Sequence, residues 1–312
     1  MDISTRIGQR PRMQTSLLTA VVMPIALGII MLGLGLGLTV DDFKRVARIL
    51  RAVGIGLACQ MLLLPAVAWG IAKGLSLPPE LAVGLMLLSA SPGGATANLF
   101  SHLAKGDVAL NLTLTATNSV LSLLTLPVIL NLAMLGFMGV DKQIPFQFAK
   151  IAQVFAIVLL PVGLGMLLKA KKPALAAGAD KPVKIFSAIF LLLLIVGAVL
   201  QERTRLSAYA QSVGLAALLF NLLSLGVGYL LPRLLRLSRK QSIAIGMEIG
   251  IHNGTLAIAI ASSPLLLNNM TVAMPAAIYS LIMFFTAGAF GWLMTRLPED
   301  AAAALAPATP AV

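Results

Sequence analysis

The chain has 312 residues, of which 59% are hydrophobic and only 11% are charged, and its mean hydropathy is +0.96. Soluble domains have about 45–50% apolar and about 25% charged residues, so this composition excludes a soluble domain and indicates an integral membrane protein. The net charge of +12 comes from loops between apolar runs, which favours a topology signal over nucleic-acid binding, and the single Cys59 excludes an intrachain disulfide framework or a cysteine metal cluster.

The first apolar run follows a basic N-terminal segment, as in a secretory signal, but it is much longer than the core of about 7–15 residues found in signal peptides. We therefore expect a retained spanning helix after an N-terminal tail of residues 1–14. A spanning helix needs about 20 mainly apolar residues. In chain order, nine segments meet this requirement: 15–40, 51–74, 81–104, 108–136, 146–168, 184–200, 209–232, 241–264 and 271–295.

One long polar connector, KAKKPALAAGADKPVK, separates the fifth and sixth segments, and the sequence has no exact internal repeat. These features predict an all-α polytopic membrane protein with its transmembrane domain in residues 15–296. The Ala/Pro-rich residues 297–312 are predicted to form a disordered tail.

The loops between the segments indicate the orientation of the chain. With the N-terminus outside, fifteen of the 23 lysines and arginines lie in inside loops. Cytoplasmic loops carry an excess of these residues. We therefore predict a multi-pass protein of the cell inner membrane with its N-terminus outside and its C-terminus in the cytoplasm. The first helix alone does not decide this, because Arg6, Arg10 and Arg12 before it nearly balance the four basic residues after it.

Glu248 is the one acidic residue that falls well inside a predicted span. A carboxylate at this depth costs at least about 2.5–3.5 kcal/mol, and such residues usually face a cavity, form a pair or bind an ion. The plainest interpretation is a protonated glutamic acid that is hydrogen-bonded to a neighbouring helix. The alternative is an ion or proton site.

Two apolar segments contain residues that interrupt helices. One break falls at Pro92, Gly93 and Gly94, and the other at Gly250, shortly before Asn253-Gly254. Interrupted spans in corresponding halves are the best sequence pointer to the binding site of a secondary transporter. Two unrelated kinks in a structural membrane protein are the alternative.

Three stretches carry a resemblance to a known family. SPGGATANLFSHLAKGDVALNLTLTATNS, CQMLLLPAVAW and EIGIHNGTLA resemble the bile acid:sodium symporter family, bacterial members included, over roughly residues 20–296. The resemblance implies inverted repeats of a ten-helix prototype, here without its first helix, as in the hepatic and ileal bile acid carriers. Two broken helices would cross at the midplane of a core of about 51–136 and 209–296, beside a panel of about 15–40 and 146–200.

The resemblance also implies two sodium sites beside the crossing and no other metal. The first site would use Asn98, Asn111, Thr115 and Glu248. The second would use Gln60, Glu248, the carbonyls of Ile249 and Ile251, and the position of His252. The chain departs from the family pattern at Ala97, where a serine is usual, at Asn111, where a hydroxyl is usual, and at His252, where glutamine is typical.

His252 leaves three interpretations open. Its side chain turns away to bond a nearby group, or it weakens the second sodium site, because hard cations prefer oxygen ligands. A third interpretation is proton coupling, because an imidazole has an ordinary pKa of about 6.5 and lies here four residues from a glutamate.

The transported molecule is expected to be an organic anion held where the half-helices begin. The candidate residues are Thr96, Asn253, Gly254 and Thr255. No arginine lies deep in a span, which favours a monoanion, either bile-acid-like or a small carboxylate such as pantoate or a 2-oxo acid.

These observations predict sodium-coupled symport of an organic anion by alternating access, with no organic cofactor, no nucleic acid and no obligate protein partner. Proton-coupled transport through Glu248 and His252 is an alternative, and a non-transporting sensor or channel is a further one. An enzyme is not expected, because the sequence has no GxSxG or HExxH motif and no paired intramembrane aspartates.

Overall fold

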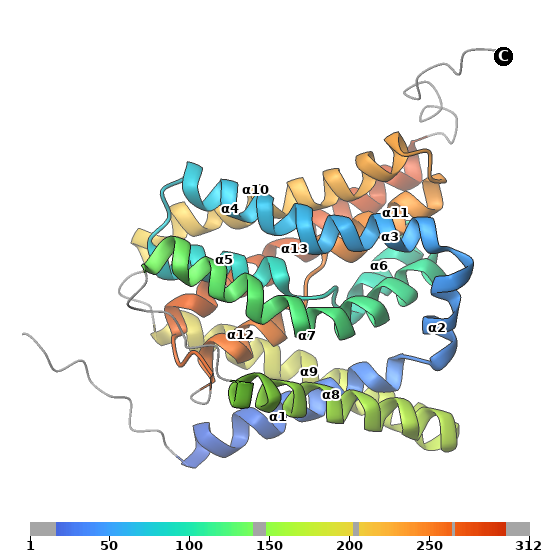
Figure 1. Cartoon of the computed structure of the whole chain (residues 1–312), viewed down its shortest axis with the longest axis horizontal. Coiled ribbons are helices and arrows are strands. Elements are labelled where there is room, and N and C mark those ends of the chain that lie inside the picture. The colour runs from blue at the N-terminus through green and yellow to red at the C-terminus, as the bar shows by residue number, and fades with distance from the viewer. Residues whose placement is uncertain (1–16, 140–147, 202–205, 264–265, 298–312) are drawn as a thin grey trace, which may run out of the picture.

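The computed structural model describes residues 17–139, 148–201, 206–263 and 266–297, and their regular elements are all helical. The predicted tail 1–14 and all but Leu297 of the predicted tail 297–312 lie outside the described residues. Along the chain the helices are α1 (Leu17–Gly37), α2 (Val40–Arg45), η2 (Val46–Arg48), α3 (Leu50–Ala58), η3 (Cys59–Leu63), α4 (Leu64–Gly74), α5 (Pro79–Ala90), α6 (Ala95–Leu103), α7 (Val108–Met138), α8 (Phe148–Lys171), α9 (Pro173–Gln201), α10 (Leu206–Leu234), α11 (Arg239–Gly250), α12 (Gly254–Ser262) and α13 (Met270–Arg296) (Figure 1).

Several of these helices have the length and composition of membrane spans. Among the described residues, Leu50–Gly74, Val213–Leu234 and Met270–Arg296 are long and apolar enough to cross a bilayer, and α7 adds a fourth if its two halves are one span. Those halves are bent by 58° at Leu123. Pro127 lies four residues later, and a proline ring inside a helix clashes with the carbonyl of the residue four positions before it, here Leu123. An integral membrane protein fits these helices, and the count of nine spans stays a prediction.

The polar connector between the fifth and sixth predicted segments is mostly helical, so its interpretation as a loop is wrong. Helix α8 ends at Lys171 and α9 begins at Pro173, so most of the connector is the first half of α9. Proline is favoured at the first position of a helix, and the alanines that follow are the strongest helix formers. The polar residues of the connector therefore form the end of a helix that extends beyond its apolar part.

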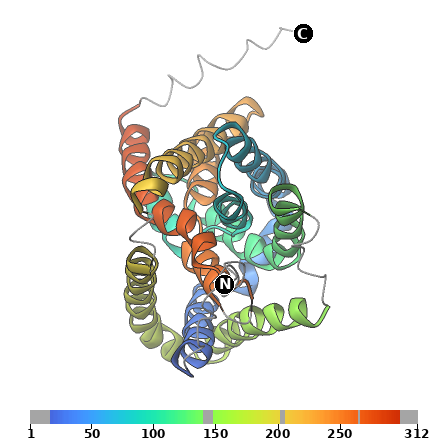
Figure 2. The ribbon, with the colours of Figure 1, turned by 90° about the vertical axis from the view of Figure 1, so that its left-hand side faces the viewer.

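Helices α1, α8 and α9 pack on one another and form a separate layer of the molecule. Figure 2 shows them below the remaining helices. Small residues allow the backbones of α1 and α8 to approach closely, because a Cβ at Gly35 would overlap the carbonyl of Val162, and a Cβ at Gly165 would overlap the carbonyl of Leu32.

Two helices of the other layer are broken. The chain is unwound between α5 and α6 at residues 91–94, and between α11 and α12 at residues 251–253. Helices α11 and α6 pack on each other and both contact α7, so the two breaks face each other inside the bundle (Figure 1).

The basic loops gather at one end of the molecule, on the right in Figure 1. Hydrogen bonds tie these loops together, because Arg51 donates to the carbonyl of Leu235 at 2.6 Å and the amide of Asp107 donates to the carbonyl of Lys240 at 2.9 Å. Lys169 likewise donates to the carbonyl of Gly37 at 2.8 Å. The side to which this end faces stays a prediction from the charge count.

The close approach of α1 and α8 can be tested with two glycines of α8. Gly165→Ala should lower the melting temperature of the purified protein by several degrees, because the added Cβ meets the backbone of α1. Gly163→Ala is the matched control, since a Cβ there meets nothing within 4 Å. Equal effects of both substitutions in a thermal unfolding assay would contradict the packing.

Candidate functional site

The two unwound segments pair with each other. The amide of Gly94 donates to the carbonyl of Ile251 at 2.7 Å, and the amide of Asn253 donates to the carbonyl of Pro92 at 2.9 Å. Gly93 and His252 form the antiparallel bridge between these bonds. A broken helix inside a bilayer needs partners for its freed backbone groups. Here each break supplies partners for the other.

The sequence places each break for a local reason. Pro92 has no N–H to continue α5, and Ser91 before it is extended, with ψ of 141°. Gly93 is required for space, because a Cβ there would overlap the carboxylate of Glu248. On the other side, α11 ends at Gly250, and the amide of Asn253 bonds across the crossing instead of to Ile249, the acceptor in an unbroken helix. The carbonyl of Ile249 is thereby freed.

Glu248 lies at the centre of the crossing and is fully buried. The hydroxyl of Thr115 donates to its Oε2 at 2.6 Å, and Nδ2 of Asn118 donates to its Oε1 at 3.2 Å. The backbone amide of Gly93 is a further hydrogen-bonding group at the carboxylate. Neither ion pair found among the described residues involves Glu248. The carboxylate is therefore held by neutral donors alone.

Five amide side chains present buried oxygens that have no hydrogen-bond partner within the described residues: Gln60, Asn98, Asn111, Asn118 and, farther along α7, Asn131. The donors of three of them are already used. Nδ2 of Asn111 donates to the carbonyl of Ala244 at 2.8 Å, and Nδ2 of Asn118 donates to Glu248. Buried polar atoms without partners are rare and costly. Oxygens around a carboxylate are the ligands that a hard cation prefers.

Gln60 reaches the crossing because its helix has a π-helical turn, Cys59–Leu63, between α3 and α4. Its Nε2 donates to the carbonyl of Ser91 at 2.9 Å and to that of Ser89 at 3.1 Å. Such turns widen a helix locally and are frequent at functional sites. The Oε1 of Gln60 is left as an acceptor.

His252 is held by the first break and by two aromatic rings. Its Nδ1 lies 3.1 Å from the carbonyl of Ser91 and must carry the proton of that bond, because a carbonyl oxygen only accepts. The imidazole stacks on Phe220 and meets Tyr279 edge-on, with ring centroids 5.5 and 5.4 Å apart. Its Nε2 is buried and has no partner within the described residues.

The carbonyl of Gly250, freed by the second break, accepts two side-chain donors that sequence reasoning missed. Nδ2 of Asn221 lies 2.9 Å away and the hydroxyl of Tyr279 lies 2.8 Å away. Thr286 in turn donates to Oδ1 of Asn221. These three residues lie on α10 and α13, far from the break in sequence. Nothing in the local pattern points to them.

Asn118 was also missed, although a signal was present. Asn111, Thr115 and Asn118 follow one another at spacings of four and three residues, which places them on one face of α7. All three are buried. A polar stripe at helical spacing in an apolar helix indicates a site, and Asn118 completes this one.

The residues expected to bind an anion differ in how exposed they are. Thr96 is exposed in the first turn of α6, whose N-cap, Gly94, has no side chain to occupy the free amides. Asn253 caps α12, because its Oδ1 accepts from the amide of Leu256 at 3.0 Å. Gly254 packs against Ser280 of α13, and Thr255 is buried. The start of α6 is thus the more open of the two.

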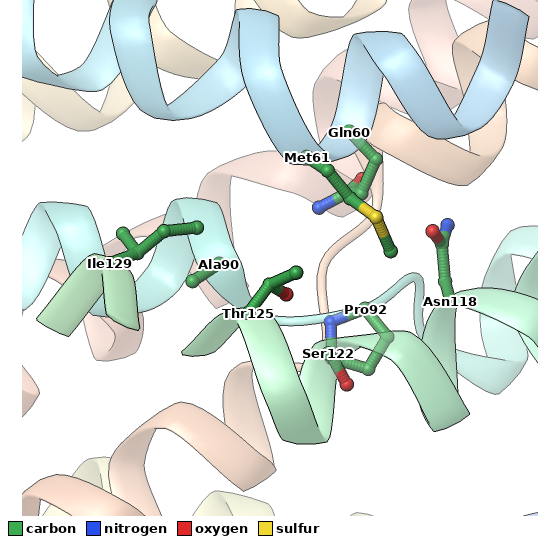
Figure 3. A pocket seen from close by; sticks show the side chains of 8 residues that line it. All are labelled: Gln60, Met61, Ala90, Pro92, Asn118, Ser122, Thr125 and Ile129. Atoms are coloured by element: carbon green, nitrogen blue, oxygen red, sulfur yellow. The ribbon is translucent and has the colours of Figure 1, made fainter. Parts of the chain in front are cut away.

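Two narrow pockets lie beside Pro92. The first has an empty volume of about 190 Å³ and is lined by Gln60, Met61 and Asn118, among others. Figure 3 shows the Met61 side chain between the amides of Gln60 and Asn118. The second, of about 300 Å³, lies between the layers, where Met31 and Val162 face Ser119 of α7 and Leu256 of α12.

A multivalent metal centre finds no support in the described part of the chain, which contains no group of three or more His, Cys, Asp or Glu side chains able to hold an ion. One carboxylate among neutral oxygens suits a monovalent cation better than a divalent one, because one negative charge balances one positive charge.

Comparison with known proteins gives a family context for this geometry. A sequence model of the sodium bile acid symporter family matches residues 17–208. The chain is 32% identical over 259 residues to YocS, an uncharacterized sodium-dependent transporter of Bacillus subtilis (strain 168), covering 82% of this chain and 77% of that protein. It is 28% identical over 302 residues to the probable chloroplastic sodium/metabolite cotransporter BASS2 of Oryza sativa subsp. japonica, covering 96% of this chain and 70% of that protein. The probable cotransporter BASS1 of Arabidopsis thaliana is 28% identical over 259 residues, covering 82% and 62%.

Because two side chains donate to the Gly250 carbonyl, we expect their substitutions to have non-additive effects on the free energy of unfolding. Tyr279→Phe and Asn221→Leu should each lower the unfolding free energy by about 1 kcal/mol, because one donor to this carbonyl remains in each variant. The double variant should lose more than the sum, because only then is a buried carbonyl left without a partner.

Chemical unfolding of the four proteins measures this cycle. Tyr229→Phe is the control for a lost hydroxyl, since Tyr229 is not among the donors to the Gly250 carbonyl and its ring packs edge-on to Phe290. Strict additivity of the two substitutions would argue against shared support of one carbonyl.

Proposed function

Because the chain belongs to the sodium bile acid symporter family, we propose that it is a secondary active transporter that carries an organic anion together with sodium by alternating access. The family consists of transporters, so the chain is not an enzyme. The observation that carries the proposal is the fully buried Glu248 at the crossing of two broken helices, hydrogen-bonded to a face of α7 on which the amide oxygens of Asn111 and Asn118 have no partner within the described residues.

The first sodium site is proposed at Asn98, Asn111, Thr115 and Glu248. The free Oδ1 atoms of Asn98 and Asn111 support it, and so does the hydroxyl oxygen of Thr115, which keeps lone pairs for a cation. The amide of Asn111 thus supplies an oxygen where the family usually has a hydroxyl. We add Asn118 as the residue that orients the carboxylate.

The second sodium site is proposed at Gln60, Glu248, Ile249 and Ile251. The free Oε1 of Gln60 and the freed carbonyl of Ile249 support it, whereas the carbonyl of Ile251 already accepts from Gly94. We assign His252 to holding the break through Ser91, because its remaining ring atom is a nitrogen, a weaker ligand for a hard cation.

The anion is proposed to bind beside Pro92, between the layers and near the uncapped start of α6. Free amides at a helix start favour a carboxylate, and Thr96 lies there exposed. The residues that line the pocket between the layers are apolar or carry hydroxyls, and none is basic. This lining suits a monoanion with an apolar body. Bile-acid-like molecules, pantoate and 2-oxo acids all belong to that class.

The movement is proposed to take place between the two layers. The layer of α1, α8 and α9 would be the panel, and the other helices, with both breaks, the core. Nine spans and inverted repeats fit the order of the helices, and the charge bias favours an outside N-terminus in a cell inner membrane. Ions and anion that bind side by side raise each other's affinity by the same factor.

Uptake into proteoliposomes tests the function. Pantoate, a 2-oxo acid and a bile acid are offered under an inward sodium gradient, and the unaltered protein should accumulate at least one of them. Glu248→Gln should abolish this uptake, because the neutral amide removes the one charge that balances the cation. Uptake that ignores sodium and follows a pH gradient would reject sodium coupling in favour of protons at Glu248 and His252.

Sodium affinity tests the site separately from transport. Thr115→Val keeps the shape of the side chain but removes the hydroxyl at Glu248, and should weaken sodium binding by about tenfold or more. Thr117→Val is the matched control on the same helix, because its hydroxyl donates only to the carbonyl of Thr113.

The shift of melting temperature with sodium concentration, measured against potassium at constant ionic strength, gives both affinities. A sodium dependence that changes equally in both variants would place the ion elsewhere.

A further inference from the structure

A larger pocket lies at the end of the molecule that gathers the basic loops. It has an empty volume of about 1110 Å³ and is built from the end of α6, the start of α11 and the end of α13. Lys105, Arg239, Lys240 and His102 line it, together with apolar residues that include Ile243 and Met294. Neither the sodium sites nor the anion pocket uses any of these residues.

The basic side chains of this pocket form none of the ion pairs found in the described part of the chain. The two ion pairs found there are Lys44 with Asp41 and Arg45 with Asp42. Asp107 follows the pocket directly in sequence, but its side chain caps α7 by accepting from the amide of Leu110. Among the described residues at the pocket, three basic side chains thus stand against the one carboxylate of Asp107, so this part of the chain offers a net positive charge to an anion.

Arg239 is fixed in place, whereas the lysines are free to move towards a ligand. The guanidinium of Arg239 is half-buried and donates to the carbonyls of Met294 and Leu297 at the end of α13. Lys105 and Lys240 are exposed. One anchored and two mobile cations around one opening suit a phosphate group.

The helices that build the pocket carry exposed apolar side chains near its lining residues in the chain. Leu99 and Leu103 of α6 are 56% and 61% exposed, Leu293 of α13 is 44% exposed, and Leu297, which follows α13 and lines the pocket, is 41% exposed. Trp292, an amphipathic residue typical of membrane interfaces, is 61% exposed on the same turn of α13. A small soluble anion makes no apolar contact with these side chains, whereas the acyl chains of a lipid can pack against them.

We propose that this pocket binds the phosphate headgroup of an anionic phospholipid, with its acyl chains along α6 and α13. Basic pockets between helices at the cytoplasmic surface are suited to such headgroups. Lys105 follows α6 and Lys240 lies in the first turn of α11, and both half-helices lead from the pocket to the crossing at Glu248. The bound lipid thus ties together the outer ends of the two half-helices that carry Asn98 and Glu248.

Lipid binding to the detergent-purified full chain tests this without a transport assay, so its outcome is independent of sodium coupling. The melting temperature is followed against the concentration of short-chain phosphatidylglycerol, short-chain phosphatidylcholine or inorganic phosphate. Phosphatidylglycerol should raise it in a saturable manner. Lys105→Gln with Lys240→Gln should increase the half-maximal concentration about tenfold or more, because each basic residue at the surface contributes to headgroup binding.

The control removes two lysines from the same end outside the pocket. Lys171→Gln with Lys172→Gln changes exposed residues where α8 ends and should leave the half-maximal concentration unchanged. Equal weakening in both double variants would show that only the net charge of the protein matters. An equal shift with phosphatidylcholine, whose phosphate is balanced by its choline, would show that a net negative headgroup is not required. Stabilisation by inorganic phosphate to the same extent would replace the lipid by a soluble anion. Lys240→Glu, a single exposed change, should weaken binding more than Lys240→Gln and gives a second readout if the double variant unfolds.

Discussion

The structure depends on keeping one negative charge in an apolar bundle. Glu248 is fully buried, and the described residues hold it with a hydroxyl, an amide and a backbone N–H rather than with a cationic side chain. Neutral donors lower the cost of burying a carboxylate but do not cancel its charge. A lysine or arginine at this point would balance the charge permanently. Neutral donors instead leave the charge to be balanced by an ion that can come and go.

The two helix breaks answer a second constraint, which is that backbone groups need partners inside a membrane. The breaks satisfy one another through the bonds of Gly94 with Ile251 and of Asn253 with Pro92. The carbonyl of Gly250 is satisfied from outside the crossing, by Asn221 and Tyr279. Both constraints meet in the same few residues, because the unwound segments that need partners are also those that place oxygens around Glu248.

The helices around the crossing are packed tightly within the layer of α1, α8 and α9 and more loosely where that layer meets the crossing. Helices α1, α8 and α9 pack closely on each other through glycines, but meet the crossing across a narrow pocket lined by apolar side chains and hydroxyls. Contacts of that kind are weakly directional, so they oppose a shift of one layer against the other less than hydrogen bonds would. At the far ends of α6 and α11, a basic pocket provides a place where the membrane itself can act on the two half-helices.

The sequence by itself determined what depends on composition and on local pattern. A mean hydropathy of +0.96 indicates a membrane protein, Glu248 stands out as the one deep carboxylate, and Pro92 to Gly94 and Gly250 predict where helices end, because a missing N–H or a missing side chain acts within one turn. The resemblance to the sodium symporters, visible in the same stretches, is confirmed by the family match.

Only the tertiary structure decided which faces meet. Asn118 bonds Glu248 across 130 positions of sequence, Tyr279 supports Gly250 from another helix, and the amide of Gln60 is aimed by a π-helical turn that no local pattern marks. The polar stretch that forms the start of α9 shows the converse limit, since polarity alone does not distinguish a loop from the exposed end of a helix. Hydrogen bonds between helices depend on packing, and packing is a property of all the helices together rather than of any one segment.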